Sequence, residues 1–327
     1  MNADVPGAYA GTGPCTLGMV EHLTVTDEHR DREIELTCRY PTAGGPHRLL
    51  VWCHGLGGSR HRSRGLAELW ASHGFVVIQP TFADSIEHVA RDHPELGLEP
   101  HHIHNNEWIT VPEVFDFMIR NLLQPPWWLA RVADVGTVLD QAPTLLDGVA
   151  DFAGSVDGDW VGVGGHSFGA YTSQLFAGVT IDLPGEGPTS FRDDRVGAVV
   201  IASGQGRNQQ GLRDGSWDTV ACPLLNITGS EDMGATTDDP NWKREPYLFA
   251  PPGDKYEAWM EGADHGLGGI GGNFPNFAEN EHQRNIVQQT TLAFWRAYIA
   301  ADGDAMAWLN SDLPNEFGSP ILSFERR

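Results

Sequence analysis

One short segment of the sequence combines residue types that suit nucleophilic chemistry. The pentapeptide Gly-His-Ser-Phe-Gly at residues 165–169 follows an apolar run at residues 160–163 and precedes a helix-like stretch. A strand, a sharp glycine-flanked turn and a helix are what a nucleophile elbow requires, because the strained turn lifts the serine hydroxyl above the sheet. A structural alternative is a serine that only caps the helix. We expect Ser167 to be the nucleophile.

A serine hydroxyl is a weak nucleophile at neutral pH and needs a neighbouring base. In proteins with a nucleophile elbow, the histidine lies on a loop after a late strand. His265 follows the apolar run at residues 256–260, and small residues at 262–263 leave room for its ring. The only other histidine in the last third, His282, is expected at the exposed start of a helix. We therefore expect His265 to be the base.

The third member of such a triad is a carboxylate that orients the histidine. Asp232 lies just beyond the apolar run at residues 224–227, between the serine and the histidine in chain order. Glu231, Asp238 and Asp264 compete for this role. Asp264 adjoins His265, and consecutive side chains in an extended loop tend to diverge, so Asp232 is the expected acid.

Attack on a carbonyl group develops negative charge on oxygen, which oriented backbone N–H groups can stabilise. One donor is expected from Phe168, the residue after the nucleophile. The other is expected from Leu56, in the glycine-rich loop at residues 54–58. These glycines also suit a tight turn between a strand and a helix, and the two roles are compatible.

Apolar runs alternate with helix-like segments along the chain, which predicts an α/β fold with a mostly parallel sheet. Residues 19–26 and 33–40 are expected to form a hairpin. Six short apolar runs are expected to be buried strands, and three segments outside the long insertion are expected to be helices. The strands are expected at residues 49–53, 75–78, 160–163, 196–201, 224–227 and 256–260, and the helices at 64–72, 170–177 and 281–300.

The alternation stops between residues 80 and 159, a segment longer than one crossover needs. We expect this segment to be an excursion of a single domain that spans residues 1–327. Two helices, at about residues 111–123 and 128–140, should lie near the strand ends where ligands bind in open sheets. Trp127 and Trp128 follow two prolines and are expected either to wall a pocket or to belong to the core.

The composition restricts the partners of this chain. Its 327 residues include 21 Lys and Arg against 44 Asp and Glu, a formal net charge of -23. Such a charge repels phosphate backbones and anionic membranes, so we expect no nucleic-acid partner. No run approaches the roughly 18 apolar residues of a membrane span, and residues 1–12 lack a signal-peptide pattern. We expect a soluble protein, cytoplasmic by default, or secreted if a leader precedes residue 1.

Neither a metal nor a cofactor is expected. The four cysteines lack Cys-X-X-Cys spacing. Cys53 and Cys222 are expected to be buried thiols, and a disulfide between Cys15 and Cys38 is one option. Histidines at 101, 102 and 104 do not recur on one helical face and have no accompanying carboxylate motif, so a solvated loop is expected there.

Three segments of the chain resemble serine α/β-hydrolases related to platelet-activating-factor acetylhydrolases and dienelactone-hydrolase-like esterases. They are residues 54–58 with 73–77, residues 165–170, and residues 251–256 running into 262–265. The resemblance implies an α/β-hydrolase fold, the triad Ser167, Asp232 and His265, and oxyanion donors at Leu56 and Phe168. True dienelactone hydrolases carry cysteine as nucleophile, which this chain does not. The family is more distantly similar to cutinase-like polyesterases.

Together these patterns predict a carboxylic ester hydrolase that needs no cofactor and forms an acyl-enzyme, acting on short to medium acyl esters. The first alternative is the same apparatus acting on polyesters or on amides. The second is a binding protein that keeps the fold without catalysis. An intact triad with two oxyanion donors favours the enzyme, because a binding protein has no need of all these groups together.

Overall fold

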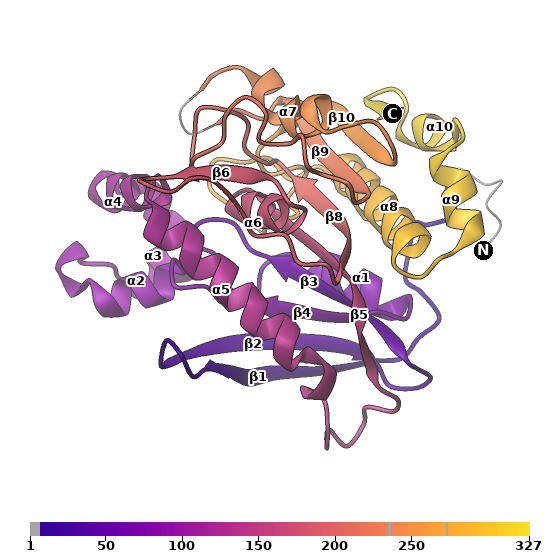
Figure 1. The fold of residues 1–327 in the computed structure, drawn as a ribbon, viewed down its shortest axis with the longest axis horizontal. Coiled ribbons are helices and arrows are strands. Elements are labelled where there is room, and N and C mark those ends of the chain that lie inside the picture. The colour runs from indigo at the N-terminus through magenta and orange to yellow at the C-terminus, as the bar shows by residue number, and fades with distance from the viewer. Residues whose placement is uncertain (1–6, 235–236, 273) are drawn as a thin grey trace.

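The computed structural model describes residues 7–234, 237–272 and 274–327. It is an α/β structure in which helices cover both faces of a large, mostly parallel sheet (Figure 1). The nine strands of this sheet lie in the order β1-β2-β4-β3-β5-β8-β9-β10-β11. They span β1 (Leu17–Asp27), β2 (Arg32–Pro41), β3 (His47–Cys53), β4 (Val76–Pro80), β5 (Val156–His166), β8 (Val196–Ala202), β9 (Leu224–Glu231), β10 (Lys255–Asp264) and β11 (Leu322–Arg326).

The six central strands, from β4 to β10 in spatial order, run parallel to one another. They coincide with the six apolar runs, and this confirms the predicted parallel sheet. The hairpin β1–β2 joins antiparallel beside β4, and β11 joins antiparallel beside β10. Because parallel strands end at one edge of a sheet, the loops after β3, β5, β8, β9 and β10 meet there.

Helices flank the sheet, and each face has its own hydrophobic core. One core packs α5 and α6 against the sheet, and the other packs α1, α8 and α9 against the opposite face. The expected helices at 64–72, 170–177 and 281–300 correspond to α1, α6 and α8. The helices are α1 (Arg64–Ser72), α2 (Ile86–Asp92), α3 (Pro100–His104), α4 (Pro112–Leu122), α5 (Pro125–Gln141), α6 (Phe168–Phe176), α7 (Glu245–Phe249), α8 (Glu281–Tyr298), α9 (Gly303–Leu309) and α10 (Leu313–Gly318).

The segment between β4 and β5 is helical and returns to the same sheet. Helices α4 and α5 match the two helices expected in this excursion. The long helix α5 lies across the face of the sheet that also carries α6 (Figure 1). A small separate cluster, with Trp108 and Met118 among its members, holds α2, α4 and the turn between them together. The excursion therefore has its own packing in addition to its contact with the sheet.

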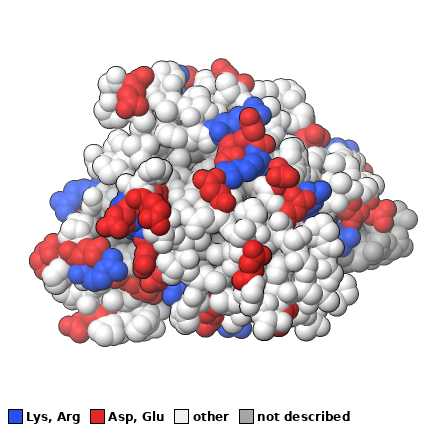
Figure 2. Space-filling view, turned by 60° about the horizontal axis from the view of Figure 1, so that its bottom comes forward, with Lys and Arg blue, Asp and Glu red and all other residues white. Residues whose placement is uncertain are grey.

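On the face in Figure 2, acidic side chains are scattered among neutral ones, and basic side chains lie beside acidic ones.

The cysteines fit the expectations only in part. Cys53 is buried as expected, whereas Cys222 is only half-buried. All four cysteines are free thiols, so the optional disulfide between Cys15 and Cys38 is absent. Cys38 lies opposite Val20 in the β1–β2 ladder. Cys15 precedes Val20 by five positions, and five residues of extended strand span about 17 Å. No helix in the described ranges is long and apolar enough to cross a membrane.

Candidate active site

Ser167 occupies a sharp turn between β5 and α6. Its backbone lies at φ 57° and ψ -118°, a conformation that costs free energy in a residue with a side chain. The flanking glycines make the turn possible. A Cβ at Gly165 would stand 2.3 Å from the carbonyl carbon of Gly169, and one at Gly169 would stand 2.0 Å from the Cys53 oxygen. The strain and the close packing together hold the serine at the edge of the sheet.

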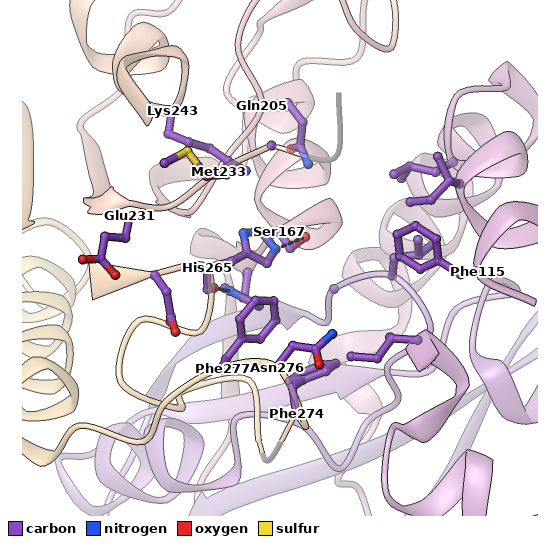
Figure 3. Close-up of a pocket in the computed structure, with 18 of the residues that line it drawn as sticks. Phe115, Ser167, Gln205, Glu231, Met233, Lys243, His265, Phe274, Asn276 and Phe277 are labelled. Atoms are coloured by element: carbon purple, nitrogen blue, oxygen red, sulfur yellow. Dashed lines mark hydrogen bonds between the residues drawn. The ribbon is translucent and has the colours of Figure 1, made fainter. Parts of the chain in front are cut away.

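The structure brings the three predicted triad residues into contact. Nε2 of His265 lies 2.9 Å from the Ser167 hydroxyl oxygen, and Nδ1 of His265 lies 2.9 Å from a carboxylate oxygen of Asp232. Each residue follows a different parallel strand: β5, β9 and β10. Figure 3 shows Ser167 and His265 side by side within a pocket. The arrangement allows a proton to pass from the serine to an imidazole that a carboxylate orients.

Asp232 is fully buried, and its carboxylate is surrounded by donors. The hydroxyl groups of Ser203 and Thr228 each donate to it at 2.8 Å, and the Lys243 ammonium lies 3.9 Å away. Burial alone would raise the pKa of this carboxyl, but the ammonium and the hydrogen bonds from His265 and Ser203 hold the pKa well below its usual range. The acid therefore stays ionised at neutral pH.

Ser203 and Lys243 were not anticipated from the sequence. The Ser203 hydroxyl also lies 2.7 Å from Nδ1 of His265, so the imidazole N–H is shared between Ser203 and Asp232. Lys243, in the 3-10 helix Pro240–Arg244, donates to the Ser203 carbonyl oxygen at 3.1 Å. Burial lowers the pKa of Lys243, although the Asp232 carboxylate opposes the shift. The position of Ser203 directly after β8 was the only available signal.

The competing carboxylates have other roles. Asp264 accepts hydrogen bonds from the N–H groups of Gly266 at 2.8 Å and Ala278 at 3.0 Å, so it braces the loop that carries His265. Glu231 is exposed at the pocket wall, and Asp238 is exposed on the following loop. The geometry thus favours Asp232 as the orienting acid.

A second histidine ties the serine turn to the histidine loop. The Nε2 of His166, the residue before Ser167, donates to the His265 carbonyl oxygen at 2.7 Å. Burial, with a smaller contribution from the neighbouring charge of His265, lowers the pKa of His166 to about 3. A ring that stays neutral can keep this hydrogen bond across the physiological pH range without adding a second positive charge beside His265.

Two backbone N–H groups near Ser167 are candidate oxyanion donors. Phe168 is the first residue of α6, so its N–H has no acceptor within the helix. Leu56 lies in the loop after β3, and its N–H donates to no backbone acceptor in the described part of the chain. Both Leu56 and Ser167 line the same pocket. The sequence predicted both as oxyanion donors, and that role stays a prediction.

Ser167 and His265 open into an apolar pocket of ≈ 480 Å³. In Figure 3, Phe115 stands across the pocket from Ser167, whereas Phe274 and Phe277 close another side. Polar side chains also line the pocket, with Gln205 and Lys243 on the side away from these two phenylalanines and Asn276 beside them. Excursion residues supply much of the apolar wall: Trp108, Ile109, Phe115, Ile119 and Leu122.

The sequence left two roles open for Trp127 and Trp128, the pocket wall and the core. Neither residue lines this pocket; Trp128 belongs to the core, and Trp127 is partly buried against it. Trp128 is 5% exposed, and its indole N–H donates to the Leu122 carbonyl oxygen at 2.6 Å. Trp127 packs near Phe117 instead. The tryptophan that lines the pocket is Trp108, from the 3-10 helix Glu107–Thr110 before α4. A Cβ at Gly57 would stand 2.6 Å from the Trp108 ring, so Trp108 lies against the loop that carries Leu56.

The histidines at 101, 102 and 104 lie in the short helix α3 rather than in the expected loop. The ring centroids of His101 and His102 lie 4.0 Å apart, with the two rings tilted by 45°. Within the described ranges, no group of three or more His, Cys, Asp or Glu side chains could hold a metal ion.

Comparison with known proteins found no match for this chain, either to a protein-family model or to a curated protein. The resemblance to acetylhydrolases and dienelactone-hydrolase-like esterases therefore stays a prediction.

Proposed function

We propose that this protein is a serine carboxylic ester hydrolase of the α/β-hydrolase fold. The observation that carries the proposal is the chain of contacts from the strained Ser167, through His265, to the buried and ionised Asp232. A strained backbone at the serine costs free energy to maintain. A serine in hydrogen-bond range of a histidine, which is itself in range of a carboxylate, is the arrangement that acyl transfer needs. The strand order, and the turn from β5 into α6, are consistent with that fold.

In the proposed reaction, Nε2 of His265 takes the proton of the Ser167 hydroxyl as its oxygen attacks the ester carbonyl carbon. The carbonyl oxygen becomes an oxyanion that accepts hydrogen bonds from the N–H groups of Leu56 and Phe168. Asp232 stabilises the imidazolium that forms. His265 then gives its proton to the departing alcohol, and the acyl group remains bound to Ser167.

Water resolves the acyl-enzyme by the same route in reverse. His265 accepts a proton from water, the hydroxide attacks the acyl carbon, and the second tetrahedral intermediate collapses when His265 returns the proton to Ser167. The apolar wall of aromatic and aliphatic residues suits the hydrocarbon part of a short to medium acyl ester.

The proposal is tested by a fluorophosphonate probe with peptide mapping, together with p-nitrophenyl esters from acetate to palmitate. We expect the probe to label Ser167, and Ser167→Ala to lower kcat by about 10^4 or more while the fold survives. Ser190→Ala, which changes an exposed serine on β7 (Gly187–Ser190), is the matched control and should keep full activity. Labelling at another serine, or turnover that persists in Ser167→Ala, would refute the mechanism.

The same experiment separates the alternatives. An anilide and a polyester film are included with the p-nitrophenyl esters, because the triad can act on amides and polymers as well. Preference for the anilide would identify an amidase, and film hydrolysis would identify a polyesterase. A protein that neither reacts with the probe nor hydrolyses any of these substrates is a binding protein, and the proposal fails.

A further inference from the structure

A buried ion pair lies beside the loop that carries Leu56. Arg131 of α5 and Asp84, which follows β4, are each 1% exposed. The guanidinium group of Arg131 donates to both oxygens of Asp84, at 2.8 Å from Nε and 2.6 Å from Nη2. The pair joins the 80–159 excursion to the edge of the sheet where the triad lies.

The remaining hydrogen-bonding capacity of Arg131 is directed to the backbone of this loop. Its Nη1 donates to the His54 carbonyl oxygen at 2.7 Å, and its Nη2 lies 3.3 Å from the Gly55 carbonyl oxygen. The same Gly55 oxygen also accepts from Nδ1 of His54 at 2.6 Å and from the Gly58 N–H at 3.1 Å. The loop is therefore fixed by its carbonyl groups.

These carbonyl contacts determine where the Leu56 N–H points. The carbonyl of Gly55 and the N–H of Leu56 belong to one planar, trans peptide unit, so they point in opposite directions. Donors held on the Gly55 oxygen turn the Leu56 N–H away from Arg131. The loop residues Gly55 and Leu56 both line the pocket with Ser167, which is the side left for this N–H.

His54 is held in the protonation state that this arrangement needs. The Phe82 N–H donates to Nε2 of His54 at 3.0 Å, which leaves the ring proton on Nδ1, the atom that donates to Gly55. Burial, followed by the charge of Arg131, lowers the pKa of His54 to about 3. The ring thus stays neutral.

The second oxyanion residue contacts the same guanidinium. Arg131 lies between two aromatic rings, with its central carbon 4.3 Å from the ring centroid of Phe82 and 4.1 Å from that of Phe168. Phe168 is fully buried at the start of α6. One side chain therefore holds the loop of the first donor and packs against the residue that supplies the second.

We propose that Arg131, anchored by Asp84, is the positioning residue that sets both oxyanion donors, Leu56 and Phe168, at their working geometry. This inference rests on the proposed ester hydrolysis. A buried ion pair contributes little net stability compared with apolar residues of similar volume, so stability alone is a weak reason for its presence. The excursion that walls the pocket then also supports stabilisation of the transition state.

The test compares Arg131→Met and Arg131→Lys with the control Asp134→Asn. Asp134 lies one turn along the same helix and is fully buried. It pairs with Arg30 and Arg32 of the β1–β2 hairpin and not with the loop that carries Leu56. For each variant kcat and KM are measured on p-nitrophenyl butyrate, with active sites counted by exhaustive fluorophosphonate labelling. A trifluoromethyl ketone reports oxyanion binding, because its serine adduct carries the same charged oxygen.

We expect Arg131→Met to lower kcat per labelled site by about 10^2-fold or more, the usual effect of losing one oxyanion donor. KM should change less than about threefold, and ketone affinity should fall with kcat. Arg131→Lys keeps the charge without the fork geometry and should lose about tenfold or more. If Arg131→Met does not fold, Arg131→Lys decides the question. Asp134→Asn should lower the melting temperature but keep kcat per site.

Three results would overturn the inference. The first is a folded Arg131 variant with kcat per site and ketone affinity near those of the wild type. The second is an equal loss of kcat in Asp134→Asn, which would mean that any loosening of α5 lowers activity. The third is a wild-type protein without esterase activity or labelling. That result would refute the proposed function itself. It can be told apart from a failure of the Arg131 inference because it is seen in the wild-type protein alone.

Discussion

Replacing Asp232 by asparagine removes one charge from the triad with almost no change of shape. In the native protein its carboxylate accepts from Nδ1 of His265 at 2.9 Å and from Ser203 and Thr228 at 2.8 Å. Lys243 lies 3.9 Å away. The variant leaves the ammonium of Lys243 without its counter-charge, and its amide group can present N–H instead of oxygen to the histidine. Both effects disfavour a positively charged His265.

The size of the loss follows from the charge interaction that disappears. Two unit charges about 4 Å apart interact by about 4 kcal/mol at an effective dielectric constant of about 20. Since each 1.36 kcal/mol changes a rate about tenfold, loss of this interaction in the transition state lowers kcat by about 10^3-fold. A wrong imidazole tautomer adds to this, and the corresponding change in a serine protease costs about 10^4. We expect Asp232→Asn to fall in this range.

The assay measures kcat on p-nitrophenyl butyrate at a pH above the histidine range, so that protonation of the base does not obscure the comparison. Glu231→Gln and Asp264→Asn are the matched controls, since each also removes one carboxylate charge. Asp264→Asn should lose some activity because Asp264 braces the His265 loop. Asp232→Asn should lose at least about tenfold more than either control. A greater loss in Asp264→Asn would refute the assignment of the acid.

Three other predictions follow. In the proposed mechanism the base works as a neutral imidazole, so kcat/KM should be lost at low pH, where the base takes up a proton, and should be unaffected by EDTA; a metal requirement would contradict this. Trp108→Ala should shift preference from acetate to octanoate esters, since Trp108 lines the pocket, whereas Trp128→Ala should lower the melting temperature without this shift; equal effects would refute the distinction. His54 and His166, with pKa values lowered to about 3, stay neutral in the native protein below pH 6.5, where the unfolded chain takes up protons. The contribution of these two histidines to the free energy of unfolding, measured with urea, should therefore be fully present above pH 6.5. It should fall between pH 6 and 5, by about 1.4 kcal/mol per pH unit for each histidine; a flat profile would contradict this prediction.

The central sheet was predictable because burial on both faces leaves a continuous apolar run, which is visible in the sequence alone. Positions within the triad were predictable for a related reason. Strands that run parallel bring their following loops to one edge, so a serine, an aspartate and a histidine that each follow such a strand are brought together. The order of Ser167, Asp232 and His265 carried enough information even though 98 residues separate the serine from the histidine.

The supporting residues were missed because nothing local distinguishes them. Lys243 and Arg131 are cations in a chain with many charges, and only the folded structure shows that both are buried beside the site. The sequence could not decide between pocket wall and core for Trp127 and Trp128, because a tryptophan pair is apolar whichever side of its helix faces the sheet. Strand β11 was missed because its five residues alternate in burial and end in charged side chains.

Ser203 gives the histidine two neighbours at a single nitrogen. Its hydroxyl oxygen lies 2.7 Å from Nδ1 of His265, closer than the Asp232 oxygen at 2.9 Å, and the two residues follow adjacent strands. A carboxylate introduced at position 203 would therefore meet the same nitrogen. The imidazole can thus be approached by an acidic group from the end of β8 as well as from the end of β9. The parallel order of the strands leaves two neighbouring positions from which one histidine nitrogen can be oriented.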